Sequence, residues 1–121
     1  MTNDIISMDL LLQHVINDAI SIGIPVSDKI ERTIYIDKKR YDRVAACYKY
    51  QFPYRYEIHL SSDTLRANRN EIKNIIAHEV LHTCLFSMDH DMPWSIYQKQ
   101  MNNILGYNIK EKYSWHQIIK K

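Results

Sequence analysis

The chain has 121 residues, of which 45% are hydrophobic and 25% are charged, and its formal net charge is +2. These values are ordinary for a globular protein, and the length predicts a single domain over residues 1–121. The small net charge gives no reason to expect nucleic acid as a partner, and no apolar run is long enough to cross a membrane. The acidic N-terminus and the isolated cysteines Cys47 and Cys84 predict a cytoplasmic protein with reduced thiols, and we expect a monomer.

The first half of the chain predicts one helix followed by a small sheet. Apolar residues at helical spacing predict an amphipathic helix over residues 8–22, which Gly23 would end. Segments rich in β-branched and aromatic residues predict three strands. These strands are expected over residues 32–36, 44–50 and 54–60, the last two as a hairpin around Pro53.

The second half predicts two further helices. Asn68 and Glu71 have the spacing of a capping box, which would open a long helix that ends near Ser87. A following helix is expected to start at residues 91–93 and to end at Gly106, and the tail over 107–121 is interpreted as a strand and a helical turn. The predicted fold class is α+β: a minimal domain with an N-terminal helix, a small three-stranded antiparallel or mixed sheet, and two C-terminal helices.

The predicted long helix contains the sequence His-Glu-x-x-His at His78, Glu79 and His82. Histidines four residues apart lie on one face of a helix, where both imidazoles can reach one Zn²⁺ ion. The glutamate beside the first histidine can take a proton from a water molecule that zinc has acidified. Random order of this composition would give the pattern roughly 0.01 times per chain, so a chance occurrence is improbable.

The surroundings of these three residues strengthen the metal hypothesis. Nearly every other residue from 75 to 86 is apolar, which predicts a helix buried on most sides. Polar groups are costly to bury there unless something offsets their desolvation, and a metal ion would do so. The alternative is a structural pair of core histidines bonded to the backbone.

A catalytic zinc usually has three protein ligands, and His90 is the candidate for the third. A turn after the helix could bring His90 back to the metal. Asp89 is a rival ligand by position, or an acceptor for an imidazole N–H. The isolated histidines are interpreted as ordinary surface or core residues; they are His14, His59 and His116.

Residues 74–110, NIIAHEVLHTCLFSMDHDMPWSIYQKQMNNILGYNIK, resemble the SprT-like zinc metallopeptidase domains, a branch of the zincins that includes Spartan. The His-Glu-x-x-His segment, a third histidine at His90, a downstream aromatic at Trp94 and the final GYNIK carry the resemblance. Upstream, Arg43, Cys47 and the strand at 58–61 fit the same family. The resemblance covers roughly residues 8–110.

Three departures from the family pattern are visible. Val44 and Ala45 stand where the family has Trp and Gly, and Asp91 stands where a Gly follows the third histidine. The four-cysteine zinc ribbon that follows many members is absent, because Cys47 and Cys84 cannot form one. The basic cluster at residues 38–40 is typical of a solvated turn, so support for DNA as a partner is weak.

The resemblance implies a zinc-dependent metallopeptidase that acts on a protein or peptide substrate. His78, His82 and His90 would hold Zn²⁺, and Glu79 would act as general base. A substrate would lie along an edge strand, for which residues 44–50 are the candidate, and would bind through backbone hydrogen bonds.

Several alternatives stay open. Tyr113 and His116 are candidate donors to the oxyanion, and Cys47 is a candidate inhibitory ligand. A non-catalytic module with a structural metal would need a fourth ligand, such as Asp89 or His116. A hydrolase that acts on a non-peptide substrate would use the same water-activating residues.

Overall fold

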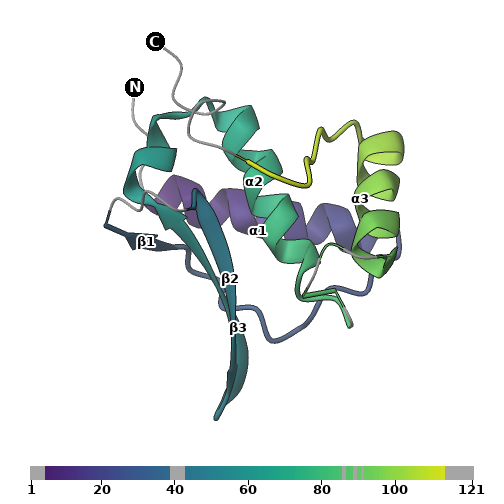
Figure 1. Ribbon diagram of the computed structural model, residues 1–121, viewed down its shortest axis with the longest axis horizontal. Coiled ribbons are helices and arrows are strands. Elements are labelled where there is room, and N and C mark those ends of the chain that lie inside the picture. Colours follow the sequence, from purple (N-terminus) through teal and green to yellow (C-terminus); the bar gives the residue numbers. More distant parts are fainter. Residues whose placement is uncertain (1–4, 39–42, 86, 89, 91, 114–121) are drawn as a thin grey trace.

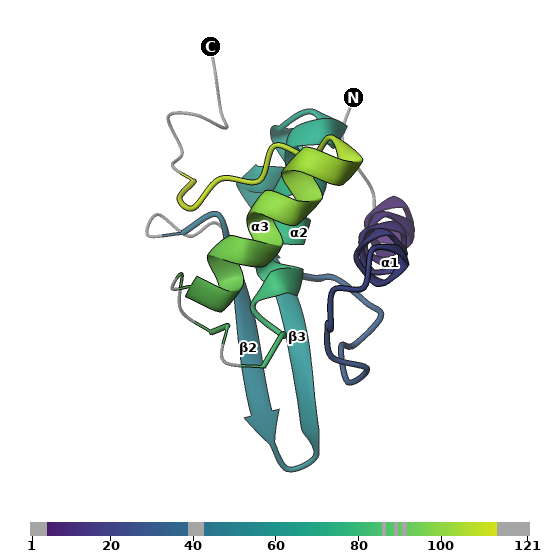
Figure 2. The same ribbon diagram turned by 90° about the vertical axis from the view of Figure 1, so that its right-hand side faces the viewer.

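The computed structural model describes residues 5–38, 43–85, 87–88, 90 and 92–113. The fold class is α+β, as predicted, with three helices and a three-stranded mixed sheet (Figure 1). The helices lie on one face of the sheet, and the hairpin of β2 and β3 extends away from them (Figures 1 and 2).

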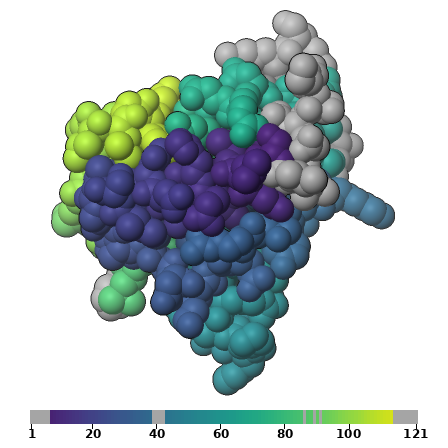
Figure 3. Space-filling model, turned by 180° about the vertical axis from the view of Figure 1, so that it is seen from behind, coloured from purple at the N-terminus to yellow at the C-terminus, as the bar shows by residue number. Residues whose placement is uncertain are grey.

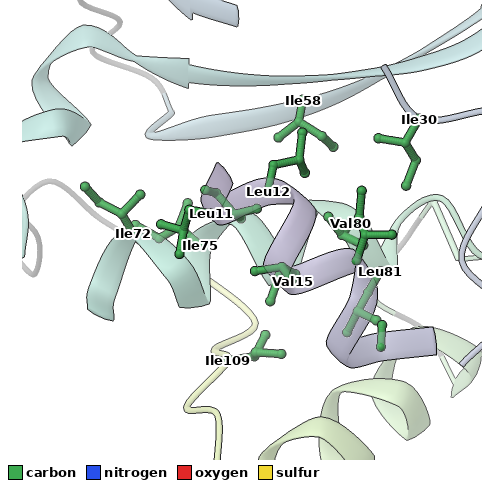
Figure 4. Packing of buried hydrophobic residues seen from close by; sticks show 14 of the residues in the cluster. Leu11, Leu12, Val15, Ile30, Ile58, Ile72, Ile75, Val80, Leu81 and Ile109 are labelled. Carbon is green, nitrogen blue, oxygen red and sulfur yellow. The ribbon is translucent and has the colours of Figure 1, made fainter. Parts of the chain in front are cut away.

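Helix α1, Ile5–Ser21, begins before the predicted residue 8 and ends close to the predicted boundary. Its apolar stripe is buried, and Figure 4 shows Leu12 of this stripe beside Ile58 of the sheet. Gly23 ends the helix with a φ of +82°, a left-handed conformation that glycine adopts at little cost. The backbone N–H of Ile24 donates to the carbonyl of Ala19, which completes a Schellman motif.

The sheet has the strand order β1-β3-β2, with bounds Tyr35–Asp37 for β1, Tyr54–Ser61 for β3 and Ala45–Gln51 for β2. Strand β1 runs parallel to β3 and starts three residues later than predicted, while β2 pairs antiparallel with β3. In β3, Ile58 and Leu60 face the core and alternate with polar residues of the outer face, as the sequence pattern indicates. Strand β2 is therefore an edge strand.

Helix α2, Arg69–Leu81, occupies the centre of the molecule and contacts both hairpin strands and both other helices. Asn68 is confirmed as the N-cap residue, because its side chain accepts from the Glu71 backbone N–H. The Glu71 carboxylate accepts from the Asn68 side-chain amide, whereas in a full capping box it accepts from the N-cap backbone N–H. A short 3₁₀ helix, Ser62–Arg66, precedes α2. Buried residues of α2 and α1 pack together with those of the sheet to form the core (Figure 4).

The prediction that this helix ends near Ser87 is wrong. The helix ends at Leu81, and His82 is its C-cap residue. The Thr83 hydroxyl donates to the carbonyl of Val80 and accepts from the backbone N–H of Ser27, so it draws the chain out of helical geometry. The apolar residues beyond this point include Cys84, which is buried in a turn rather than in a helix.

Helix α3, Met92–Leu105, has the predicted bounds and ends at Gly106, whose φ is +75°. The strand predicted in the tail is absent from residues 107–113, which run as irregular chain. Side-chain amides form hydrogen bonds with the backbone of this segment in place of a neighbouring strand. The Asn102 amide bonds both the N–H and the carbonyl of Ile109, and the Asn74 side chain accepts from the backbone N–H of Asn108. The remainder of the tail lies outside the described residues.

Candidate metal centre

Three imidazoles meet where α2 ends. His78 and His82 lie one turn apart, and the turn after α2 brings His90 back to them. The Nε2 atom of His90 is 2.9 Å from Nε2 of His78 and 3.0 Å from Nε2 of His82. Among the residues that the structure describes, this is the group of histidine, cysteine or acidic side chains placed to hold a metal ion. The expected return of His90 is thus confirmed, although the helix stops earlier than predicted.

Backbone carbonyls orient two of the rings. Nδ1 of His78 lies 2.7 Å from the carbonyl oxygen of Lys110, and Nδ1 of His82 lies 2.7 Å from that of Ser87. Each Nδ1 donates in these bonds, so both Nε2 atoms present lone pairs to the centre of the cluster. His90 can donate one proton to only one of them. A cation at the centre would satisfy all three rings together.

The distances fit a small metal ion. Three nitrogens at tetrahedral angles around zinc, each about 2.0–2.1 Å from it, lie about 3.3 Å apart. The two separations from His90 are 2.9 and 3.0 Å, a few tenths of an ångström below this value, and all three ligand atoms lie within 4.8 Å of one another. The three histidines could therefore hold a metal ion.

Burial keeps His78 in the form that a metal needs. Burial, together with the charges of His82 and His90, lowers the pKa of His78 to about 3, although the bond to Lys110 opposes the shift. His78 is therefore neutral at physiological pH and available as a ligand. No proton has to leave it when a metal binds.

Glu79 lies beside the cluster, with its Oε2 atom 3.9 Å from Nε2 of His78. Burial raises the pKa of this carboxyl group to about 8, and the charge of Arg43 partly offsets the shift. A nearby cation favours the carboxylate, so a bound metal would lower this pKa again. The position and environment suit a group that exchanges protons near neutral pH.

The Trp94 ring packs against all three imidazole rings. Its ring centroid lies 4.8, 5.7 and 4.6 Å from those of His78, His82 and His90, and its Nε1–H donates to the backbone carbonyl of His78. In the sequence, Trp94 is the aromatic residue expected downstream of His90, and the structure buries it. Because Trp94 contacts all three rings, it can also hold them in position. Its place four residues after His90 in the sequence could have suggested this contact.

A cleft of about 330 Å³ opens over the three histidines and Glu79. Its opposite wall is the start of β2, which contributes Ala45, Ala46 and Cys47, with Arg43 just before the strand. Burial and the charge of Glu79 raise the pKa of the Cys47 thiol, so this side chain stays protonated in the metal-free protein. The cleft thus joins the metal centre to an edge strand.

The structure separates the other candidate residues from this centre. His14 lies on α1 and pairs with Asp18 at 3.3 Å, while His59 lies on the outer face of the sheet between Asp37 and Glu57. Tyr113 does lie near the centre, with its ring centroid 5.6 Å from that of His78 and its hydroxyl accepting from the Lys110 N–H. Asp89 and His116 lie outside the described residues, and so does Asp91.

No helix in the described part of the chain is long and apolar enough to span a membrane. Comparisons of the chain with protein-family models, with curated proteins and with solved structures find no match.

Proposed function

We propose that this protein is a zinc-dependent peptide hydrolase of the SprT-like type. The observation that supports it most is the convergence of three imidazole nitrogens beside a buried glutamate, in a cleft that borders an edge strand. Zinc at this position would acidify a water molecule and polarise the carbonyl of the scissile peptide bond.

The residues of the chain would divide the remaining work. Glu79 takes the proton of the attacking water and passes it to the leaving amine. The carbonyls of Lys110 and Ser87 hold two ligand rings in the required tautomer, and Trp94 fixes their positions. A substrate backbone would pair with the outer edge of β2, which borders the cleft and which no strand among the described residues covers.

The number of ligands favours catalysis over a structural metal. The described residues provide three ligands, whereas structural zinc sites are normally closed by four. A site with three protein ligands keeps a position open for water, and the cleft provides access to it. The competing hypotheses are a metal-binding module without activity and a hydrolase that acts on a non-peptide substrate.

Hydrolysis of an unfolded protein tests the proposal. The zinc-loaded chain should cleave fluorescently labelled, denatured casein, and chelation should stop the reaction. Glu79→Gln should keep the metal but lower kcat by about 10²–10⁴-fold, because it removes the general base. His14→Ala is the matched histidine control and should behave as wild type. Wild-type protein that holds one zinc ion and cleaves no peptide bond would contradict the proposal.

A further inference from the structure

The hairpin of β2 and β3 ends in an exposed aromatic tip, which we define as residues 49–55. Phe52 is 96% exposed, Tyr54 45% and Tyr50 37%. The hairpin extends well beyond the helices, and the view from behind shows it projecting past the body of the molecule (Figures 2 and 3). Neighbouring exposed aromatic side chains at the end of a projecting element are typical of an interaction surface.

The tip is also positively charged. Residues 49–55 include Lys49 and Arg55 but no acidic residue, and Arg55 also pairs with the Glu57 carboxylate, which is 3.2 Å from its Nε atom. The Lys49 ammonium lies 5.6 Å from the ring centroid of Tyr54, and the Arg55 guanidinium lies 4.2 Å from that of Tyr50. Each face of the hairpin therefore presents a tyrosine with a cation beside it. Such a surface is complementary to apolar and acidic side chains.

The outer edge of β2 connects this tip to the metal centre. The Ser61 N–H donates to the carbonyl of Val44, so the residues of β2 that bond to β3 are Ala46, Tyr48 and Tyr50. The alternating residues Ala45, Cys47, Lys49 and Gln51 direct their N–H and carbonyl groups to the open side. No described residue bonds to these groups.

The length of this edge suits an extended polypeptide. The path from Ala46, in the wall of the cleft, to Gln51 at the tip covers five residues, or about 16 Å. A chain that pairs with Ala45 at the cleft continues along Cys47 and Lys49 and arrives beside Phe52. A folded protein cannot present such a segment unless it exposes a free strand or loop.

We propose that the hairpin tip is a second recognition site for the substrate, and that it selects unfolded, apolar or acidic polypeptide segments several residues from the scissile bond. This inference rests on the proposed function for the identity of the reaction, but binding at the tip can be measured without hydrolysis. The continuous edge from the cleft to the tip favours a polypeptide over nucleic acid or lipid as the occupant.

Two substrates of different length test this inference. The long probe is reduced and carboxymethylated α-lactalbumin, an acidic, permanently unfolded chain. The short probe is a quenched hexapeptide, which extends only about 10 Å to either side of its scissile bond and cannot reach the tip. The double variant Phe52→Ser/Tyr54→Ser should raise KM for the long probe about tenfold with kcat unchanged. The reason is that it removes apolar surface that the bound probe would cover. The ratio of kcat/KM between the two probes should fall by the same factor.

A separate variant tests the backbone hydrogen bonds between β2 and the bound polypeptide. Lys49→Pro removes an N–H group that points to the open side, so the bonds between β2 and β3 remain. It should weaken binding of the long probe several-fold more than Lys49→Ala, which removes the side chain and its charge but keeps the backbone N–H. Thermal unfolding of each variant checks that the hairpin is intact. Leu10→Ser, which changes an exposed apolar residue on α1, is the surface control and should bind as wild type.

Binding distinguishes a failure of this inference from a failure of the proposed function. The zinc-loaded Glu79→Gln variant should bind fluorescein-labelled long probe, and the tip substitutions should weaken that binding about tenfold even if the wild type cleaves nothing. Equal binding with and without the aromatic tip would overturn the inference. Preferential binding of a single-stranded oligonucleotide, or of vesicles of anionic lipid, that depends on Phe52 would also overturn it.

Discussion

At the scale of single residues, burial shifts the pKa values of two groups in the candidate centre. Glu79 and His78 are both buried, and burial shifts their pKa values in opposite directions, to about 8 and about 3. Both residues are therefore neutral near pH 7 in the metal-free protein. A cation in the cleft would convert Glu79 to the carboxylate while leaving His78 neutral.

Trp94→Phe tests whether the indole positions the ligands. The change keeps an aromatic ring but removes the N–H that donates to the carbonyl of His78. We expect the dissociation constant for zinc to rise about tenfold, because partners of metal ligands have effects of this size. Zinc titration against a competing chelator measures it. Tyr97→Phe on the same helix is the control, and an equal loss of affinity in both variants would contradict the positioning role.

Glu57 provides a test of pH dependence away from the metal centre. Burial alone would raise the pKa of Glu57, but hydrogen bonds from His59 and Arg55 and the charge of Arg55 outweigh it and hold the pKa below its usual value. A carboxyl group whose pKa is lower in the folded state stabilises the fold above its unfolded pKa, near 4.5, and loses this effect as the pH falls.

We therefore expect Glu57→Gln to lower the free energy of unfolding at pH 7 by about 1–2 kcal/mol. The difference from wild type should shrink as the pH falls below about 4.5. Urea unfolding between pH 3 and 7 measures both effects. The exposed Glu111→Gln is the control, and a difference that stays constant down to pH 3 would show that the lost interaction is not ionic.

At the scale of elements, the sequence predicted the helices and the hairpin well because each has a local signal. The N-cap residue Asn68, the alternation in β3 and the glycines at the ends of α1 and α3 all act within a few residues. The predicted end of α2 was too late in the sequence, because the helix ends at a contact with a residue from a distant part of the chain. Thr83 bonds to Ser27, and no local pattern reveals that contact.

The N-cap of α2 can be tested by substitution. Asn68→Ala removes the side chain that accepts from the Glu71 N–H and should cost about 1 kcal/mol of stability. Asn103→Ala, at an exposed position within α3, should be neutral or slightly stabilising because alanine is the better helix former. Chemical denaturation of the two variants provides the comparison. Equal stability of both would contradict the capping role.

At the scale of the whole molecule, the metal centre depends on segments that are far apart in the sequence. The ligands come from α2 and the following turn, Trp94 comes from α3, and the carbonyl of Lys110 comes from the segment after that helix. The ligand residues could be predicted because their spacing is local to one helix. The supporting carbonyls and the wall formed by β2 could not, because only the tertiary fold brings them together.

Because the centre joins these segments, metal binding should stabilise the whole fold. At a free zinc concentration of 100 times the dissociation constant, the gain is about 2.7 kcal/mol, which corresponds to a rise in Tm of about 10 °C. Differential scanning fluorimetry with zinc, and then with excess chelator, measures this rise and its reversal. His90→Ala should largely remove the effect, and an undiminished rise in that variant would place the metal elsewhere.

The zinc content of the purified chain, measured by mass spectrometry after dialysis against metal-free buffer, tests the metal centre most directly. We expect one zinc ion per chain in the wild type, in Glu79→Gln and in the control His14→Ala, and much less in His90→Ala. A folded wild-type protein that retains no zinc after refolding with it, or a His90→Ala variant that retains a full equivalent, would contradict a centre formed by these three histidines.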